Sequence, residues 1–206
     1  MRTQAKLVVA LLAVVAVLVP FGSASAATST SLSQVINAGT LSVDIVDGSG
    51  VSIASPAISF GATSFDFACQ TTTATLGTAT QKIAVKNPKK AGVKIDLNAV
   101  TPATDKWTHT NLTDVYKYND AAGTGCTNGQ MTVSGGTFTK TAGNGTPTYT
   151  MPVGAFSSTS PVTLFSNTGN VPYNGELTAY TLSQKIPAEQ ADGTYSLPMN
   201  ITYVAQ

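Results

Sequence analysis

The side chains that could do acid–base or nucleophilic chemistry are sparse in this sequence. His109 is the only histidine, and Glu176 and Glu189 are the only glutamates. A Ser-His-Asp site needs a nucleophile and an acid around its histidine, but His109 lies in a polar stretch and no Gly-x-Ser-x-Gly turn is present. A glycosidase pair would have to draw on the eight aspartates, and their spacing singles out no two of them. We therefore expect no enzyme and no cofactor.

One acidic segment has the residue types of a calcium site. Asp114, Asn119 and Asp120 precede the glycine-containing run 121–125, and Asn128 follows it. Oxygen donors of this kind can hold Ca²⁺, but the segment lacks the regular spacing of a calcium loop and its closing glutamate. Asp, Asn and Gly are also common turn formers. We expect a turn here, and no metal site.

Three aromatic residues form the one candidate ligand-binding patch. Trp107, Tyr116 and Tyr118 fall within a short segment, and in a strand Tyr116 and Tyr118 would share one face. Exposed aromatic rings at such spacing can stack on sugar rings. The alternative is that the three rings pack in the core or across strands. Both interpretations remain open at this point.

The N-terminus has the three parts of a secretory signal peptide. Arg2 and Lys6 form a positive n-region, Leu7–Pro20 is continuously apolar, and 24–26 reads Ala-Ser-Ala. This order predicts a signal peptide over 1–26. The alternative is a membrane anchor, but the apolar stretch is short for a hydrocarbon layer about 30 Å thick.

The composition after the signal peptide excludes several classes of partner. Arg2 is the only arginine, so the mature chain 27–206 has none, and its nine lysines face ten acidic residues. Nucleic-acid binding normally needs a basic patch, so we expect no nucleic-acid partner. No second apolar stretch of spanning length follows, so we also expect no membrane span in the mature chain.

Cys69 and Cys126 are the only cysteines, and both lie in the predicted mature chain. Two cysteines in an exported protein most often form a disulfide. The alternatives are a reactive thiol or a metal site, although two cysteines and one distant histidine make a poor zinc set. We therefore predict a Cys69–Cys126 disulfide.

Most of the mature chain alternates between apolar and polar residues in short runs, which predicts strands. Gly, Pro, Asn and Asp separate these runs, as in antiparallel sandwiches and barrels. The runs are Thr40–Val46, Val51–Ala54, Ile58–Phe67 with a bend at Gly61, Gln81–Lys86, Val93–Leu97, Val115–Tyr118, Met131–Val133, Thr137–Thr139, Thr148–Val153, Val162–Phe165, Leu177–Leu182 and Tyr195–Val204. We predict an all-β fold: one antiparallel β-sandwich of Ig-like or Greek-key type over 39–206, after a flexible lead-in at 27–38.

The order of several short motifs resembles a WxL-type domain of bacterial cell-surface proteins. The matching pieces are Gly39–Val43, Ile58–Gly61, Ile83–Asn87, Gly92–Leu97, Ile186–Ala188, Gly193–Tyr195 and Asn200–Tyr203. Val93–Ile95 and Ile201–Tyr203 stand where the family has its two Trp-x-Leu signatures. The resemblance implies a β-sandwich on the bacterial surface, and WxL domains are held non-covalently on peptidoglycan.

A second resemblance concerns Tyr180–Gln184 followed by Gly193–Tyr195. This order is similar to the closing segment of Ig-like pilin domains that form Lys–Asn isopeptide bonds. A glutamate catalyses the bond in those domains, and Gln184 stands at its place here. We expect no isopeptide bond in this chain.

Together these features predict a secreted bacterial cell-surface protein with a structural or adhesive role, retained non-covalently at the cell wall. Its expected partners are cell-wall polysaccharide or other surface proteins. One alternative is a pilin-like filament subunit, which would self-assemble when 27–38 inserts as a strand into a neighbouring copy. Another is a secreted carbohydrate-binding module.

Overall fold

The computed structural model describes residues 33–37, 39–120, 126–169 and 171–206. The predicted signal peptide and most of the predicted lead-in lie outside these residues. The chain divides into Met1–Ile36 and Asn37–Gln206, and every strand below belongs to the second unit. The described residues contain no α-helix. None of their segments is a helix long and apolar enough to cross a membrane.

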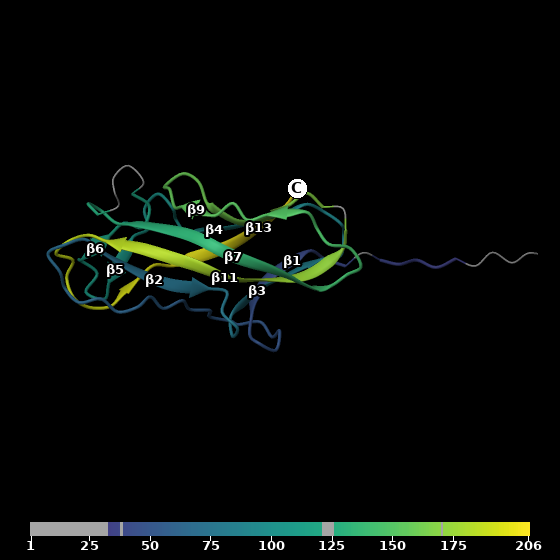
Figure 1. The fold of residues 1–206 in the computed structure, drawn as a ribbon, viewed down its shortest axis with the longest axis horizontal. Helices are drawn as coiled ribbons and strands as arrows, with labels where there is room; N and C mark the ends of the chain where they lie inside the picture. Colours follow the sequence, from purple (N-terminus) through teal and green to yellow (C-terminus); the bar gives the residue numbers. More distant parts are fainter. Residues whose placement is uncertain (1–32, 38, 121–125, 170) are drawn as a thin grey trace, which may run out of the picture. The chain divides into compact units, whose positions relative to one another are not determined.

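The largest sheet is organised around its longest strand, β11 (Figure 1). Its strands are β1 (Ser42–Val46), β2 (Gln70–Leu76), β3 (Lys82–Asn87), β7 (Gln130–Ala142), β9 (Gly154–Ala155) and β11 (Tyr173–Ile186). β7 pairs with β11 along one edge. On the other edge, β3 pairs with the first part of β11 and β2 with the last part. All of these pairings are antiparallel.

Two smaller sheets complete the fold. The second sheet has the order β13–β4–β10–β8, and the third has the order β12–β5–β6. Their strands are β4 (Val93–Ala99), β5 (Trp107–His109), β6 (Val115–Tyr116), β8 (Tyr149–Thr150), β10 (Val162–Asn167), β12 (Tyr195–Ser196) and β13 (Met199–Ala205). These pairings are also antiparallel.

The core lies between the first and second sheets. Phe138 of β7 packs against Phe165 of β10 with ring centroids 5.0 Å apart. The hydroxyl of Tyr180 on β11 donates a 2.9 Å hydrogen bond to the carbonyl of Leu164 on β10. Fully buried residues from both sheets belong to one cluster, among them Ile83, Val85, Ile95, Leu164, Phe165, Leu177 and Leu182. The predicted all-β, antiparallel fold is confirmed.

The predicted disulfide is also confirmed. Cys69 and Cys126 are bonded, with their Cα atoms 5.3 Å apart. Cys69 immediately precedes β2, and Cys126 lies shortly before β7. Because β2 and β7 flank β11 on opposite sides, the bond joins the segments that lead into both neighbours of the central strand.

β7 and β11 share a change of side-chain direction that the sequence pattern obscured. In β11 the buried positions are Leu177 before the change and Tyr180 and Leu182 after it, so the alternation skips one residue. Ala179 has a positive φ of 59°, and Gly136 on β7 has a φ of 105°. A positive φ reverses the local backbone. β7 pairs with β11 on both sides of this change, so the two predicted strands Met131–Val133 and Thr137–Thr139 are one continuous strand.

The prediction of a strand over Ile58–Phe67 is wrong. The described chain has no strand there, and Phe65 and Phe67 are 52% and 77% exposed. Their rings meet edge to face at 5.2 Å. The strand that occupies this edge of the sheet is β2, which Thr72, Ala74 and Leu76 place against the core with threonines facing outward.

Other predicted strands are also shorter than expected. Val115–Tyr118 keeps only Val115–Tyr116, and Val51–Ala54 keeps only an isolated bridge at Ser52. Thr148–Val153 keeps only the two residues of β8 before Pro152 and the positive φ of Val153 interrupt it. Tyr195–Val204 divides into β12 and β13 around Leu197 and Pro198. Proline has no backbone N–H to donate to a ladder, so it favours such an interruption.

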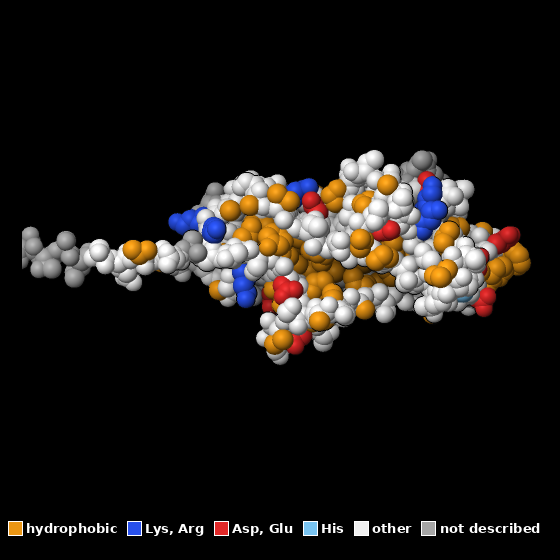
Figure 2. Space-filling model, turned by 180° about the vertical axis from the view of Figure 1, so that it is seen from behind, with side chains coloured by type: hydrophobic (Ala, Val, Ile, Leu, Met, Phe, Trp, Pro, Cys, Tyr) orange, Lys and Arg blue, Asp and Glu red, His pale blue; other side chains and the backbone are white. Residues whose placement is uncertain are grey.

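Part of the core reaches the surface between two sheet edges. Leu41 and Val43 at β1, and Leu197, Met199 and Ile201 at β13, pack against the buried cluster but are only half-buried. β1 and β13 lie on the far side in Figure 1. Seen from behind, that face carries a hollow band of hydrophobic side chains (Figure 2).

Candidate functional site

The predicted aromatic residues lie at the small third sheet. Trp107 on β5 is paired in register with Tyr116 on β6, and their rings are stacked with centroids 6.0 Å apart. Phe60 places its edge against Trp107 at 5.4 Å, and Tyr195 of β12 packs on Tyr116 at 5.2 Å. Trp107 is half-buried within this group.

A buried glutamine fixes the tryptophan. The indole Nε1–H of Trp107 donates a 2.9 Å hydrogen bond to Oε1 of Gln184 on β11. The Gln184 amide nitrogen donates to the carbonyls of Lys185 and Lys117, at 2.7 and 3.3 Å. Gln184 is fully buried. The resemblance to isopeptide-forming domains would place a catalytic glutamate here. The side chain is instead a neutral amide, and it links the third sheet to the central strand.

The two tyrosines are packing residues. Tyr118 is completely buried against Phe156, with ring centroids 5.6 Å apart, and Tyr116 is only 8% exposed. Burial raises the pKa of both phenols above the usual value, and the neighbouring Tyr195 adds to the rise for Tyr116. The ligand-stacking interpretation of Tyr116 and Tyr118 is therefore wrong, because packing covers their rings.

His109 is likewise part of the structure of this end. Its Nδ1 accepts a 3.0 Å hydrogen bond from the backbone N–H of Asn111, and its ring packs on Tyr195 at 5.0 Å. Gly193 has a φ of 135°, and a Cβ at this position would collide with Nε2 of His109. The close approach explains the glycine and covers the second ring nitrogen.

The acidic segment consists of hydrogen-bonded turns where it is described. Asp114 accepts from the side-chain amide of Asn111 at 2.6 Å, and Asp120 accepts from that of Asn128 at 2.8 Å. The run 121–125 lies outside the described residues. Elsewhere in the chain, the described residues contain no group of three or more His, Cys, Asp or Glu side chains placed to hold a metal.

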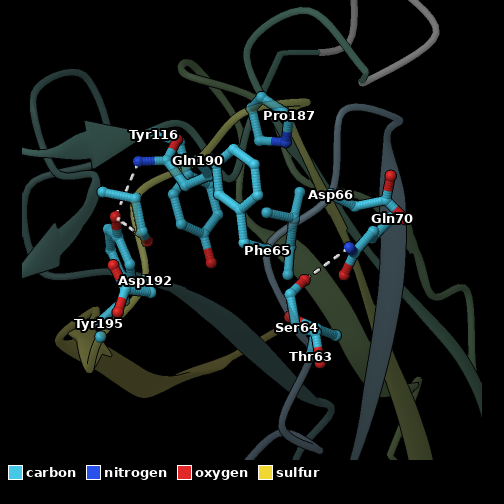
Figure 3. Close-up of a pocket in the computed structure, with 13 residues that line it drawn as sticks. Thr63, Ser64, Phe65, Asp66, Gln70, Tyr116, Pro187, Gln190, Asp192 and Tyr195 are labelled. Carbon is cyan, nitrogen blue, oxygen red and sulfur yellow. Dashed lines mark hydrogen bonds between the residues drawn. The ribbon is translucent and has the colours of Figure 1, made fainter.

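A shallow pocket opens beside the aromatic group (Figure 3). Two loops form it: 63–66, before β2, and 187–193, between β11 and β12. The backbone N–H of Glu189 donates to the carbonyl of Asp66 at 2.9 Å and holds the loops together. The lining residues are Thr63, Ser64, Phe65, Asp66, Gln70, Tyr116, Ile186, Pro187, Gln190, Ala191, Asp192, Gly193 and Tyr195.

Hydrogen bonds among the lining residues fix their positions. Gln190 donates through Nε2 to the Tyr195 hydroxyl at 2.9 Å, and that hydroxyl donates to the carbonyl of Ala191. Gln70 donates to the carbonyl of Ser64 at 2.7 Å. The half-exposed ring of Phe65 lies among these polar groups (Figure 3).

The lining of the pocket suits a small polar ligand that has one apolar face. An aromatic ring can stack on the C–H face of a sugar, while amide and carboxylate groups bind its hydroxyls. Phe65 and Asp192 offer these two kinds of contact in one place. The sequence pattern missed this pocket because its two loops are more than 100 residues apart in the chain, and Phe65 reads there as a strand residue.

Comparison of the chain with models of known protein families, with curated proteins and with solved structures finds no match. The resemblance to WxL-type domains therefore remains a prediction.

Proposed function

We propose that this chain is an exported structural and adhesive protein of a bacterial cell surface, held there by non-covalent contacts. The observation that carries the proposal is the Cys69–Cys126 disulfide, which joins the segments leading into β2 and β7. Such bonds form and persist in oxidising compartments outside the cytoplasm. The signal-peptide pattern over 1–26 supports the same location.

The charge balance favours packing and hydrogen bonding over electrostatic attachment. The predicted mature chain has no arginine and nearly equal numbers of lysines and acidic residues. Attraction to anionic wall polymers is then weak, and salt screens it within about 8–10 Å. Adhesion in this account depends on contacts that salt does not remove.

The pocket supports the adhesive part of the proposal. Phe65 at 52% exposure is an aromatic ring available at the surface, and polar side chains surround it. Stacking of a ring on a flat ligand contributes about 1–3 kcal/mol in the comparable case of nucleic-acid bases. Cell-wall polysaccharide is the ligand class that fits this combination. The same combination of groups supports a second candidate function, that of a secreted carbohydrate-binding module.

The test is co-sedimentation of the purified mature protein with isolated bacterial peptidoglycan at low and high salt. We expect retention at both salt concentrations and weaker retention of Phe65→Ala. Val51→Ala is the control, because Val51 is an exposed apolar residue that does not line the pocket, whereas the ring of Phe67 contacts that of Phe65. Release of the wild-type protein by salt alone would contradict the proposed contacts. If both substitutions weakened retention on peptidoglycan equally, the pocket would not be the binding site.

A further inference from the structure

The outer edge of β13 carries unpaired backbone groups. Among the described strands β13 pairs with β4 alone. The N–H of Val100 donates to the carbonyl of Pro198, and the N–H of Gln206 donates to that of Gly92. Because hydrogen-bonded pairs alternate in an antiparallel ladder, the even-numbered residues of β13 bond to β4. The backbone groups of Met199, Ile201 and Tyr203 therefore point away from the sheet.

The outer edge of β1 is open in the same way over its first half. The N–H of Asp47 donates to the carbonyl of Val51, and the N–H of Ile53 donates to that of Ile45. These bonds cover the second half of the edge. By the same alternation, the backbone groups of Val43 point outward, and no hydrogen bond between described residues reaches them.

The two open edges approach each other at one point. The Tyr203 hydroxyl lies 3.4 Å from the carbonyl oxygen of Leu41 and donates to it. Beyond this contact, the half-buried side chains of Val43, Met199 and Ile201 reach the surface. They belong to β1 and β13, and the face seen from behind carries a hollow hydrophobic band (Figure 2). Two unpaired edges beside exposed core residues are the usual acceptor site for an added β-strand.

The segment that precedes β1 has the composition of such a strand. Residues 27–39 read Ala-Thr-Ser-Thr-Ser-Leu-Ser-Gln-Val-Ile-Asn-Ala-Gly, without a charge or a proline. An extended strand places Leu32, Ile36 and Ala38 on one face. In the described part of this segment no residue belongs to a strand, and Ile36 is 85% exposed. The described apolar side chains of the segment, Val35 and Ile36, therefore have little cover within a single chain.

We propose that the groove between β1 and β13 binds one extended strand, residues 27–39, from a second copy of this chain. The donor then pairs with the open edges, and its apolar face covers Val43, Met199 and Ile201. Each copy has one donor and one acceptor, so the contact is heterologous and continues into a filament unless it closes into a ring. This inference deepens the structural role proposed above and makes no use of the Phe65 pocket.

The test uses two full-length mature variants that disable opposite sides of the contact. Ile36→Asp places a charge on the donor face and leaves the groove intact. Ile201→Asp places a charge in the groove and leaves the donor intact. Asn200→Asp is the matched control, because Asn200 is an exposed neighbour of Ile201 on the same strand and stands opposite the neutral Asn98. Mass is measured by light scattering after size-exclusion chromatography, over a range of concentrations.

We expect the wild type and Asn200→Asp to form oligomers that grow with concentration, and each of the other variants alone to be monomeric. An equimolar mixture of Ile36→Asp and Ile201→Asp should form dimers and nothing larger, since only one productive contact remains. A monomeric mixture, or a monomeric wild type, would overturn the inference. Peptidoglycan binding by the monomeric Ile36→Asp variant would show that the adhesive proposal stands independently.

Discussion

Trp107 and Gln184 are joined by a 2.9 Å hydrogen bond from the indole Nε1–H to the amide oxygen. The bond links β5 of the small third sheet to β11, the central strand of the largest sheet. Gln184 is fully buried and uses its amide nitrogen for two backbone carbonyls. One neutral side chain thus holds the aromatic end of the domain against the core.

Replacing Trp107 with phenylalanine should therefore destabilise the fold. Trp107→Phe keeps an aromatic ring against Tyr116 but leaves the Gln184 oxygen buried without its donor. An unsatisfied buried acceptor costs about 1–3 kcal/mol. The free energy of unfolding, measured in urea, should fall by that amount. A change close to zero would mean that water replaces the indole, and the bond would then have no structural importance.

Stability should decrease at alkaline pH because buried tyrosines resist ionisation. Burial raises the pKa of Tyr180, and burial together with Tyr195 raises that of Tyr116. In the unfolded chain a tyrosine ionises near pH 10, so above this pH the unfolded state loses protons that the folded state keeps. The free energy of unfolding then falls as pH rises. Thermal melting between pH 8 and about 11 measures the decrease.

Tyr116→Phe provides the control for this alkaline effect. The variant removes one ionisable phenol, so its melting temperature should depend less steeply on pH above about 10. Tyr116 makes no side-chain hydrogen bond through its hydroxyl among the described residues, which makes the substitution mild. An equal slope for variant and wild type would assign the effect to other groups.

The change of side-chain direction shared by β7 and β11, at Gly136 and Ala179, predicts one stabilising and one destabilising substitution. Ala179 has a φ of 59°, a conformation that costs a residue with a side chain about 1–2 kcal/mol relative to glycine. Ala179→Gly should raise the melting temperature. Gly136→Ala should lower it, because the added Cβ would meet the Tyr180 ring and Met151 at a φ of 105°. Calorimetry of both variants decides, and changes in the same direction would exclude backbone strain as the cause.

The sequence pattern was sufficient where one face of a strand meets the core. Ile83 and Val85 on β3, and Ile95 and Leu97 on β4, alternate with more exposed residues or lie in an apolar run, and both strands were predicted. β2 was missed because its inward residues are small or polar, as in Thr72 and Ala74. Alternation of apolar and polar residues does not show whether a segment pairs with a neighbouring strand. The loop containing Phe65 and Phe67 has this alternation and was therefore wrongly predicted to be a strand.

The candidate site depended on contacts that spacing cannot reveal. Trp107 and Tyr116 were correctly placed near each other, but whether their rings face solvent depends on Phe60 and Tyr195, which come from distant segments. The Phe65 pocket is formed by two distant loops, which the hydrogen bond from Glu189 to Asp66 joins. Both features depend on contacts between segments far apart in the chain, which the spacing of residues in a single sequence does not reveal.

The intact mass of the native protein, recovered under non-reducing conditions from fractionated cells, tests the central claim most directly. The account predicts a chain of residues 27–206, lighter by the hydrogens lost in one Cys69–Cys126 disulfide. It also predicts no loss of ammonia, because the buried Gln184 is a neutral amide and cannot act as the acid that an isopeptide bond requires. The protein should be found in the wall or filament fraction, or in the medium. A full-length chain with two free thiols in the cytoplasmic fraction would contradict it.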